Sequence, residues 1–195
     1  MSSPVAIVTQ RLCLLALDAA SARDQLEGRA RFFKRLRVHP PVLWPPPLYD
    51  DRAMRWGLAR LDEGWDPAWL MRAVVTRAPG LGRARLVGVA GFKGPPDENG
   101  EIEIGYSIVP SEQRKGYCTE AVAALLEFAW SDPRTVFVSA HTHSDEAAEA
   151  SRKVLERAGF RGQKKIEENF VVRYEKLRIT LPNHSACESQ GVLSG

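Results

Sequence analysis

The stretch Glu101–Ala129, EIEIGYSIVPSEQRKGYCTEAVAALLEFA, contains a strand, a polar turn and a helix in immediate succession. Its first part places apolar side chains at every second position from Ile102 to Ile108, which is the pattern of a strand. Pro110 ends that strand. From Cys118 onward, apolar residues recur at spacings of three and four, as on the buried side of a helix. We therefore predict that the fold is organised around this strand–turn–helix unit.

The turn of this unit, Gln113–Cys118 (QRKGYC), presents successive backbone N–H groups at the start of the helix. The first amides of a helix have no partner within it and the helix dipole is positive there, so such a turn can hold an anion. Gly116 allows a close approach to the backbone, and Arg114 and Lys115 add positive charge. An ordinary strand–turn–helix without a ligand fits the same pattern, and physical reasoning from the residues leaves both readings open.

Length and composition indicate a single globular domain. Of 195 residues 44% are hydrophobic, and we predict one domain over residues 1–180 followed by a disordered tail at 181–195. No apolar run approaches the roughly 20 residues that span a bilayer, and the first residues lack the features of a signal peptide. Three scattered cysteines fit no metal or disulfide spacing, which favours a cytoplasmic protein. A net charge of +3 is too small to indicate nucleic-acid binding.

The N-terminal part is predicted to contain a strand at 5–17 and a helix from Asp18 to residue 31. The most basic stretch follows at Arg29–Arg37 (RARFFKRLR). It could bind a nucleic acid or a membrane surface, but we favour an amphipathic helix with a solvated basic side.

The segment 39–49 (HPPVLWPPPLY) contains five prolines, which exclude regular structure. We predict a stiff loop at the edge of a pocket, with Trp44 as its packing anchor. Asp50 and Asp51 then start a helix that runs through Leu61, because the helix dipole favours acidic residues in the first turn.

Further strands are predicted at 69–76, 85–92, 135–141 and 169–180, and a helix at 144–158 that Ser144 caps and Gly159 ends. Gly88 and Gly91 within the second of these strands indicate a bend or a close backbone neighbour. The strand at 102–109, the helix after it and the strand at 135–141 follow one another directly. This succession predicts a parallel crossover within one sheet.

The turn Gln113–Cys118 resembles the acyl-CoA loop, Q/R-x-x-G-x-G/A, of the GNAT acetyltransferases. The flanking EIGYSIVP and TEA resemble the branch that includes the ribosomal-protein N-terminal acetyltransferases. TQRL at 9–12, LVGVAGF at 86–92 and SRKVLERAGF at 151–160 occur in the order expected of that branch. The resemblance covers roughly residues 5–178, and four ordered matches are far more specific than the loop alone.

The resemblance implies an α+β, single-domain GNAT fold: a mixed, mostly antiparallel sheet of about seven strands with a central splayed parallel pair, and helices on both faces. It also implies acetyl-CoA as cosubstrate and coenzyme A as product, with the pyrophosphate on the amides of Arg114–Thr119 and the pantetheine arm between the strands at 102–109 and 135–141. Val109 would hold the thioester through its main chain. The implied coenzyme-binding residues are Ile108, Val109, Gln113, Arg114, Lys115, Gly116, Tyr117, Cys118, Thr119 and Thr142.

Two positions depart from the family pattern. Cys118 stands where glycine or alanine is usual, and we interpret it as a core residue, because a thiol nucleophile would need a base beside it. Ala148 stands where the branch often has asparagine. One polar contact near the thioester is therefore missing, so that either Ser151 or Thr142 takes that role or catalysis is weak.

Acetyl transfer to an amine requires a neutral nucleophile and a proton for the departing thiolate. The resemblance assigns these tasks to Glu103 as base, acting through water, and to Ser151 as acid. A solvated surface carboxylate and a small polar residue in a helix stripe are the competing readings. His141 and His143 have no third ligand nearby, so we predict no metal site.

The sequence does not identify the acceptor amine, which could be a protein N-terminus, a small amine or an antibiotic. We expect the proline-rich loop, Asp50 and Asp51 to line the acceptor side and to favour a cation. A non-catalytic acyl-CoA-binding sensor or scaffold is the alternative function. We predict no nucleic-acid and no membrane partner, and the sequence leaves open whether the chain forms a homodimer.

Overall fold

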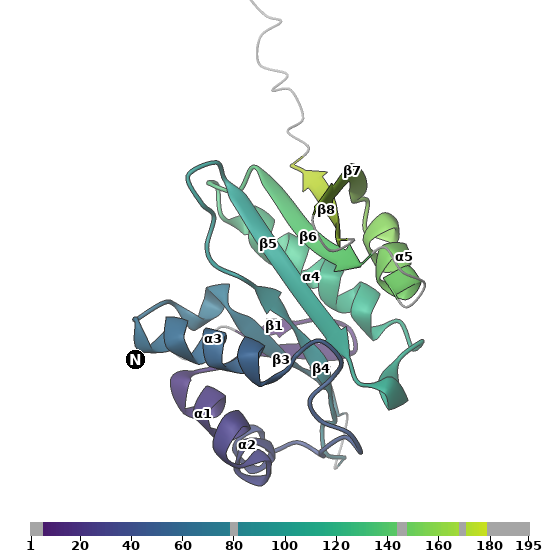
Figure 1. Cartoon of the computed structure of the whole chain (residues 1–195). Helices are drawn as coiled ribbons and strands as arrows, with labels where there is room; N and C mark the ends of the chain where they lie inside the picture. Colours follow the sequence, from purple (N-terminus) through teal and green to yellow (C-terminus); the bar gives the residue numbers. More distant parts are fainter. Residues whose placement is uncertain (1–5, 79–81, 144–147, 168–170, 179–195) are drawn as a thin grey trace, which may run out of the picture.

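An eight-stranded mixed sheet runs through the molecule in the order β1-β2-β3-β4-β5-β6-β8-β7 (Figure 1). The computed structural model describes residues 6–78, 82–143, 148–167 and 171–178. The strands are β1 (Ile7–Val8), β2 (Leu12–Ala16), β3 (Met71–Thr76), β4 (Leu86–Phe92), β5 (Glu101–Ile108), β6 (Phe137–His143), β7 (Arg161–Glu167) and β8 (Val171–Leu177). The helices are α1 (Ala19–Glu27), α2 (Arg29–Leu36), α3 (Asp51–Asp62), α4 (Tyr117–Ser131) and α5 (Glu149–Arg157).

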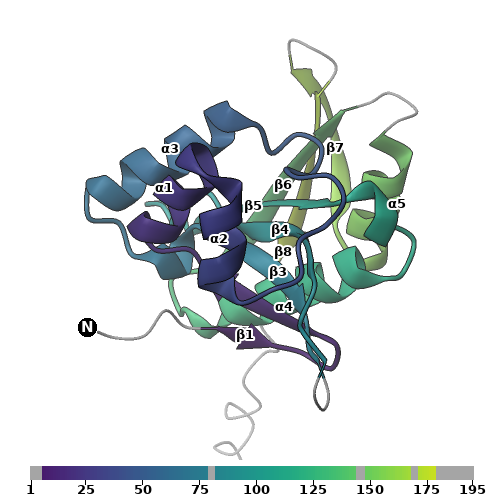
Figure 2. The same ribbon diagram turned by 90° about the horizontal axis from the view of Figure 1, so that it is seen from below.

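Two layers of helices enclose this sheet (Figures 1 and 2). On one face α1, α2 and α3 pack over β2–β4, and their core includes Phe32 and Met54. On the other face α4 and α5 pack over a second core that includes Leu125 and Leu155. The neighbouring strands are antiparallel except for β5 and β6, which are parallel. The predicted α+β fold with helices on both faces and a central parallel pair is confirmed.

The strand–turn–helix unit predicted at Glu101–Ala129 is β5, a short 3-10 turn and α4. Strand β6 then returns parallel to β5, as the immediate succession of strand, helix and strand predicted. The buried side of α4 carries the small and branched residues Ala121, Val122 and Leu125, whose side chains are fully enclosed. The helix can pack closely against the sheet because these side chains leave little bulk between the two layers.

The predicted single strand at 5–17 is wrong, because the chain turns back on itself between β1 and β2. The backbone N–H of Thr9 donates to the carbonyl of Leu12, and the N–H of Leu12 donates to the Thr9 hydroxyl, each at 2.9 Å. A threonine that satisfies nearby backbone groups with its own hydroxyl favours a turn over a continued strand.

The predicted helix from Asp18 to residue 31 is also divided. Asp18 caps α1 as expected, but Gly28 is extended and separates α1 from α2. The basic stretch is an amphipathic helix, as favoured: Phe32 is fully buried, and Arg35 donates to Asp24 at 2.6 Å. Part of the positive charge of α2 is therefore engaged within the protein.

The proline-rich loop packs through Trp44, whose side chain is only 7% exposed and lies against the rings of Phe32, Phe33 and Tyr49. This confirms Trp44 as the anchor of the loop. Asp50 caps α3 by accepting a hydrogen bond from the Ala53 N–H at 2.9 Å, and the predicted helix start is confirmed.

Strand β4 contains two glycines that the neighbouring backbone requires. A Cβ at Gly88 would lie 2.3 Å from the Ser107 carbonyl oxygen, and one at Gly91 would lie 2.4 Å from the Leu70 carbonyl oxygen. Both contacts are far too short for a side chain, so the predicted close neighbour is confirmed at both positions.

Strand β7 is an addition to the predicted elements. Its sequence, RGQKKIE, has no alternation of apolar residues, because it forms the edge of the sheet and pairs only with β8. At the other end of this region, the described part of the predicted helix at 144–158 begins at Glu149. The proposed caps at 144–146, the first and last residues of the predicted terminal strand (169–170 and 179–180) and the predicted tail lie outside the described residues. Within the described part of the chain, no helix combines the length and apolar character needed to cross a membrane.

Candidate functional site

The parallel strands β5 and β6 stop pairing halfway along their length. Their register runs from Glu101–Phe137 to Ile104–Ala140, and no described strand pairs with this edge of β5 beyond Ile104. Strand β5 continues to Ile108 alongside β4, while β6 continues to His143 alongside β8. The main chain of β5 from Gly105 onward therefore has an open edge in the middle of the sheet.

The turn before α4 adopts the geometry of an anion-binding loop. Arg114 and Gly116 both have left-handed backbone conformations, with φ of 60° and 79°. Among the described residues, the N–H groups of Arg114, Lys115 and Gly116 donate no hydrogen bond to the protein. The first amides of α4, at Tyr117–Thr119, have no partner within the helix. Left-handed residues at such a turn direct successive N–H groups into one concavity, which suits a phosphate group.

Side chains tie this loop to the end of β5. The Gln113 side-chain amide donates to the carbonyl of Ile108 at 3.0 Å. Lys115 and Arg85 both pair with Glu112, at 2.8 Å and 3.3 Å. The Lys115 ammonium is therefore partly neutralised, so much of the positive potential of the loop comes from its backbone amides.

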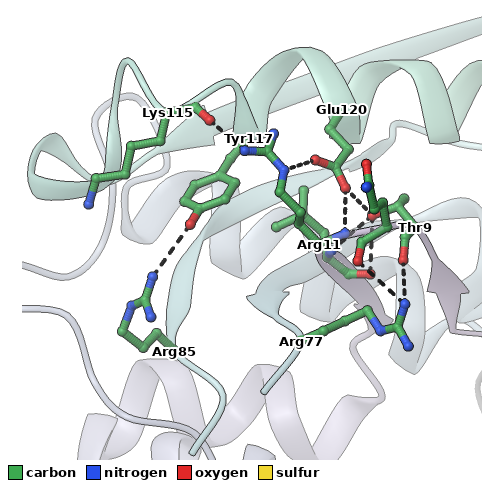
Figure 3. A network of polar contacts seen from close by, with 9 residues as sticks. Thr9, Arg11, Arg77, Arg85, Lys115, Tyr117 and Glu120 are labelled. Carbon is green, nitrogen blue, oxygen red and sulfur yellow. Dashed lines mark hydrogen bonds and ion pairs between the residues drawn. The ribbon is translucent and has the colours of Figure 1, made fainter. Parts of the chain in front are cut away.

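A second set of contacts attaches the β1–β2 turn to the same loop (Figure 3). Arg11 donates from its backbone N–H and its Nε to the Glu120 carboxylate, at 2.8 Å and 2.6 Å. Its Nη1 donates to the Lys115 carbonyl at 2.9 Å, and its guanidinium lies 5.0 Å from the centre of the Tyr117 ring. Thr9 donates to the same carboxylate at 2.5 Å. Burial alone would raise the pKa of Glu120, but these hydrogen bonds from Thr9 and Arg11 outweigh it and lower the pKa.

A cationic cavity of about 480 Å³ adjoins this network, beside the ring of Tyr117. Arg85 donates to the Tyr117 hydroxyl at 3.4 Å, and Arg77 donates to the Thr9 carbonyl at 3.1 Å (Figure 3). The cavity is lined by Gln10, Arg11, Thr76, Arg77, Ala78, Arg85 and Tyr117. Sequence reasoning identified TQRL as a family signature but missed Glu120, its partner in α4.

The predicted base, Glu103, lies on the face of the sheet that α3 covers. Its carboxylate pairs with the Lys93 ammonium and lies 2.9 Å from Nδ1 of His141 on β6. His141 therefore pairs with the Glu103 carboxylate. Among the residues that the structure describes, no three histidine, cysteine, aspartate or glutamate side chains are grouped so that they could hold a metal ion. Glu101 is placed differently, because it accepts from Ser139 at 2.5 Å and pairs with Arg173 at 2.8 Å.

The predicted acid, Ser151, contacts a tyrosine that sequence reasoning did not single out. The hydroxyls of Ser151 and Tyr106 lie 3.0 Å apart, and the Tyr106 hydroxyl is also 3.3 Å from the Ser151 carbonyl oxygen. A tyrosine phenol is neutral near pH 7, and burial raises the pKa of Tyr106 further above its ordinary value. A tyrosine within the apolar row of a buried strand was the available signal, since a buried phenol needs a partner.

Glu103 and Tyr106 project to opposite faces of the sheet, because residues an odd number of positions apart alternate along a strand. Strand β5 stops pairing with β6 between these two residues, at Ile104. A ligand that enters at this point meets a carboxylate on one face and a pair of hydroxyls on the other.

The role expected of Val109 is not supported. Its N–H donates to the carbonyl of Val87 at 3.0 Å, its carbonyl accepts from the N–H of Glu112 at 2.9 Å, and its side chain is fully buried. Both main-chain groups that were expected to hold a thioester are already engaged within the protein. The open main chain lies instead at Gly105–Ser107, nearer the centre of β5.

The other predicted coenzyme residues lie around the same opening. Thr142 is buried on β6, two residues beyond the last pair with β5. Cys118 lies in the first turn of α4, and burial raises the pKa of its thiol to about 12. A thiol with so high a pKa is a poor nucleophile near neutral pH, which agrees with the interpretation of Cys118 as a packing residue.

A cavity of about 340 Å³ lies between α3 and the sheet. It is lined by Tyr49, Asp50, Arg52, Ala53, Trp56, Gly57, Met71, Phe92 and Lys93. The proline-rich loop runs past β5 nearby, where the Ser107 hydroxyl donates to the Pro47 carbonyl at 2.6 Å. Of the two acids predicted for the acceptor side, Asp50 lines this cavity with its carboxylate engaged as the cap of α3, and Asp51 is not among the lining residues.

Known proteins resemble this chain in sequence and in fold. The family described as "Acetyltransferase (GNAT) domain" matches residues 11–161. The uncharacterized N-acetyltransferase YjdG of Bacillus subtilis (strain 168) is 44% identical over 75 residues, which are 38% of this chain and 44% of that protein. The chain thus aligns with less than half of the length of this relative.

Two solved structures share the fold at low sequence identity. A putative ribosomal-protein-serine acetyltransferase from Vibrio cholerae has a TM-score of 0.62 at 17% identity, with 91% of this chain and 100% of that one covered. The microcin C7 self-immunity acetyltransferase MccE, in complex with acetyl-CoA and AMP, has a TM-score of 0.58 at 16% identity, with 87% and 94% covered. At these identities the likeness establishes the fold alone.

Proposed function

The chain belongs to the GNAT acetyltransferase family, and from this membership we propose that it transfers the acetyl group of acetyl-CoA to a primary amine by direct attack through a tetrahedral intermediate. One observation carries the proposal. The open edge of β5 begins beside Glu103 on one face and Tyr106 on the other, and the same strand leads into the anion-binding loop at the start of α4. A thioester with a phosphorylated tail requires these features together.

The pyrophosphate of acetyl-CoA would bind the amides of Arg114–Thr119, as the clustered unpaired N–H groups and the backbone approach at Gly116 favour. The pantetheine arm contains amides that can pair with the open main chain of β5 from Gly105 to Ser107. Ile108 and Gln113 hold the strand and the loop together through their hydrogen bond, and Thr142 lies across the opening on β6. MccE, which has the same fold, was solved with acetyl-CoA bound.

Glu103 would accept the proton of the attacking amine, directly or through water. Amines are largely protonated near neutral pH, so a carboxylate beside the acceptor raises the reactive fraction. Lys93 and His141 fix the position of this carboxylate from two sides. The amine nitrogen then bonds to the thioester carbonyl carbon.

Ser151 and Tyr106 would supply the proton that the departing thiolate takes when the carbon–sulfur bond breaks. Their hydroxyls form one hydrogen-bonded pair, so a proton that Ser151 gives up can be replaced from Tyr106, which regains a proton from solvent once coenzyme A has left. This pair provides a polar group near the thioester although Ala148 stands where the branch often has asparagine. The amine proton would thus be accepted on one face of the sheet, and the proton for the thiolate would be donated from the other face.

The test is a screen of primary amines with acetyl-CoA that measures release of free thiol, run beside calorimetric titration of acetyl-CoA. We expect micromolar binding and amine-dependent thiol release. Tight binding without turnover on any amine would favour the alternative function, a non-catalytic acyl-CoA sensor or scaffold. No binding of acetyl-CoA would overturn both.

A further inference from the structure

The cavity between α3 and the sheet has the size and lining of a small-molecule site. Its volume of about 340 Å³ falls at the lower end of the range for ligand pockets, and its walls are largely apolar. Trp56 and Tyr49 provide aromatic surface, and Met71 provides a flexible apolar one. Trp56 remains 41% exposed although it is a large apolar residue, which leaves ring surface available to a ligand.

This cavity adjoins the proposed transfer centre from the α3 side. A Cβ at Gly105 would lie 3.5 Å from Cε of Met71, so the Met71 side chain covers the first residue of β5 beyond the last pair with β6. Lys93 lines the cavity as well, and its ammonium pairs with the Glu103 carboxylate. A molecule in the cavity therefore lies next to both the proposed base and the open edge of β5.

Gly57 keeps the space between α3 and the sheet open, although a glycine makes the helix less stable. It lies in the interior of the helix, where glycine is less stable than alanine, and it lines the cavity. A Cβ built on Gly57 meets no atom within 4 Å, so neither packing nor backbone conformation requires a glycine here. The missing side chain instead enlarges the room between the helix and the sheet.

The charged groups of the cavity disfavour a second cation. Arg52 and Lys93 line it, and the Asp50 carboxylate is engaged with the first turn of α3. A polyamine or a polycationic antibiotic would bring additional positive charge beside Arg52 and the Lys93–Glu103 ion pair, where the lining carboxylate, Asp50, already caps α3. The expectation of an acceptor with extra cationic groups is therefore replaced by that of an apolar one.

We propose that this cavity holds an aromatic group attached to the acceptor, so that the acceptor class is primary amines that carry an aromatic ring a few bonds from the amino group. The proposal rests on the proposed acetyl transfer. The ring packs between Trp56 and Met71, and the amino group extends toward Glu103 and the open edge of β5.

Three amides with the same α-amino group test the proposal: glycinamide, phenylalaninamide and lysinamide, each assayed with acetyl-CoA. We expect kcat/KM to be at least about tenfold higher for phenylalaninamide than for glycinamide, because an aromatic side chain leaves water for an apolar cavity. Lysinamide should be no better than glycinamide. Equal rates for glycinamide and phenylalaninamide would overturn the aromatic acceptor while leaving acetyl transfer intact.

Two variants locate the preference in the cavity. Gly57→Leu fills the cavity, and Trp56→Ala removes its main ring surface. Each variant should lower the ratio of kcat/KM for phenylalaninamide to kcat/KM for glycinamide toward one, while glycinamide is still acetylated. Ala59→Leu adds the same side chain at an exposed position of α3 that does not line the cavity, and it should leave the preference unchanged. Thermal melting of each variant identifies those that fail to fold. A preference that both folded cavity variants retain overturns the assignment.

Direct binding separates this proposal from the activity on which it rests. If no amine is acetylated, the proposed function fails, and phenylalaninamide is then titrated against the protein loaded with coenzyme A by NMR. Binding that Gly57→Leu weakens at least tenfold and Ala59→Leu does not would support the aromatic site. Absence of binding, or binding that Gly57→Leu leaves unchanged, would overturn it.

Discussion

The hydroxyls of Tyr106 on β5 and Ser151 on α5 lie 3.0 Å apart and join the two elements on the face of the sheet that α4 covers. Either oxygen can be the donor, since both hydroxyls are neutral at physiological pH, and burial raises the pKa of the phenol further. We therefore propose that the two hydroxyls act as one proton-donating unit.

Removing either hydroxyl of this unit should slow turnover without weakening the binding of acetyl-CoA. We expect Ser151→Ala and Tyr106→Phe each to lower kcat roughly 10²-fold, a typical contribution of a general acid. The double variant should lose little more than the worse single one, because the hydroxyls act in series. Steady-state kinetics with saturating acetyl-CoA measures this. Fully additive losses would show that the two hydroxyls act independently.

Glu103→Gln should lower the rate most below neutral pH. There the amine is protonated and depends on a base, whereas at high pH free amine attacks without help. The pH profile of kcat/KM for the amine measures this effect, and the Kd of acetyl-CoA should not change. Glu101→Gln is the matched control, because Glu101 is on the same strand but pairs with Arg173 and Ser139. An unaltered profile in Glu103→Gln would reduce Glu103 to a surface carboxylate.

Glu120→Gln should destabilise the protein and make its stability less dependent on acid. The pKa of Glu120 in the folded protein is below its ordinary value of 4.5, so its stabilising contribution is complete above pH 4.5 and is lost as pH falls through the folded pKa. We expect a loss of about 1–2 kcal/mol in the free energy of unfolding at pH 7, from the hydrogen bonds of Thr9 and Arg11.

Urea unfolding between pH 7 and pH 3 measures both effects of this change. Glu127→Gln, at an exposed position of the same helix, should leave the unfolding free energy unchanged at each pH. If the two variants behave alike, the network in Figure 3 contributes nothing to stability.

Two glycines with equally open surroundings should respond oppositely to alanine. Gly57→Ala should stabilise the protein by about 0.5–1 kcal/mol, because alanine is the better residue inside a helix. A Cβ added at Gly64 would also meet no atom within 4 Å, but the φ of Gly64 is +85°, so Gly64→Ala should destabilise by about 1 kcal/mol. Melting temperatures of the two variants decide this. A destabilised Gly57→Ala would mean that α3 has no room at this point.

The main elements of the fold could be predicted from the sequence because the residue patterns that indicate them are local. The alternation at Ile102–Ile108, the spacing of apolar residues in α4 and the direct return to β6 each lie within one continuous stretch. Edge strand β7 escaped prediction for the same reason, since an edge strand with little buried surface needs no apolar pattern.

The contacts that complete the candidate site could not be predicted in this way. Glu120 accepts hydrogen bonds from Thr9 and Arg11, which lie more than one hundred positions away in the sequence. The hydrogen-bonded hydroxyls of Tyr106 and Ser151 are 45 positions apart. A carboxylate in the first turn of a helix has the same local pattern whether it faces solvent or another element. The engagement of the Val109 main chain is equally invisible, because any residue at a strand end carries the same two groups.

The divergence of β5 and β6 has a consequence for association with other chains. A strand edge at the border of a sheet is a template on which other proteins can add a strand. Here the free edge of β5 faces β6 in the middle of the sheet and does not lie at its border (Figure 1). The fold can thus offer strand main chain to a slender ligand, while β6 on the other side of the opening limits the approach of a strand from another chain.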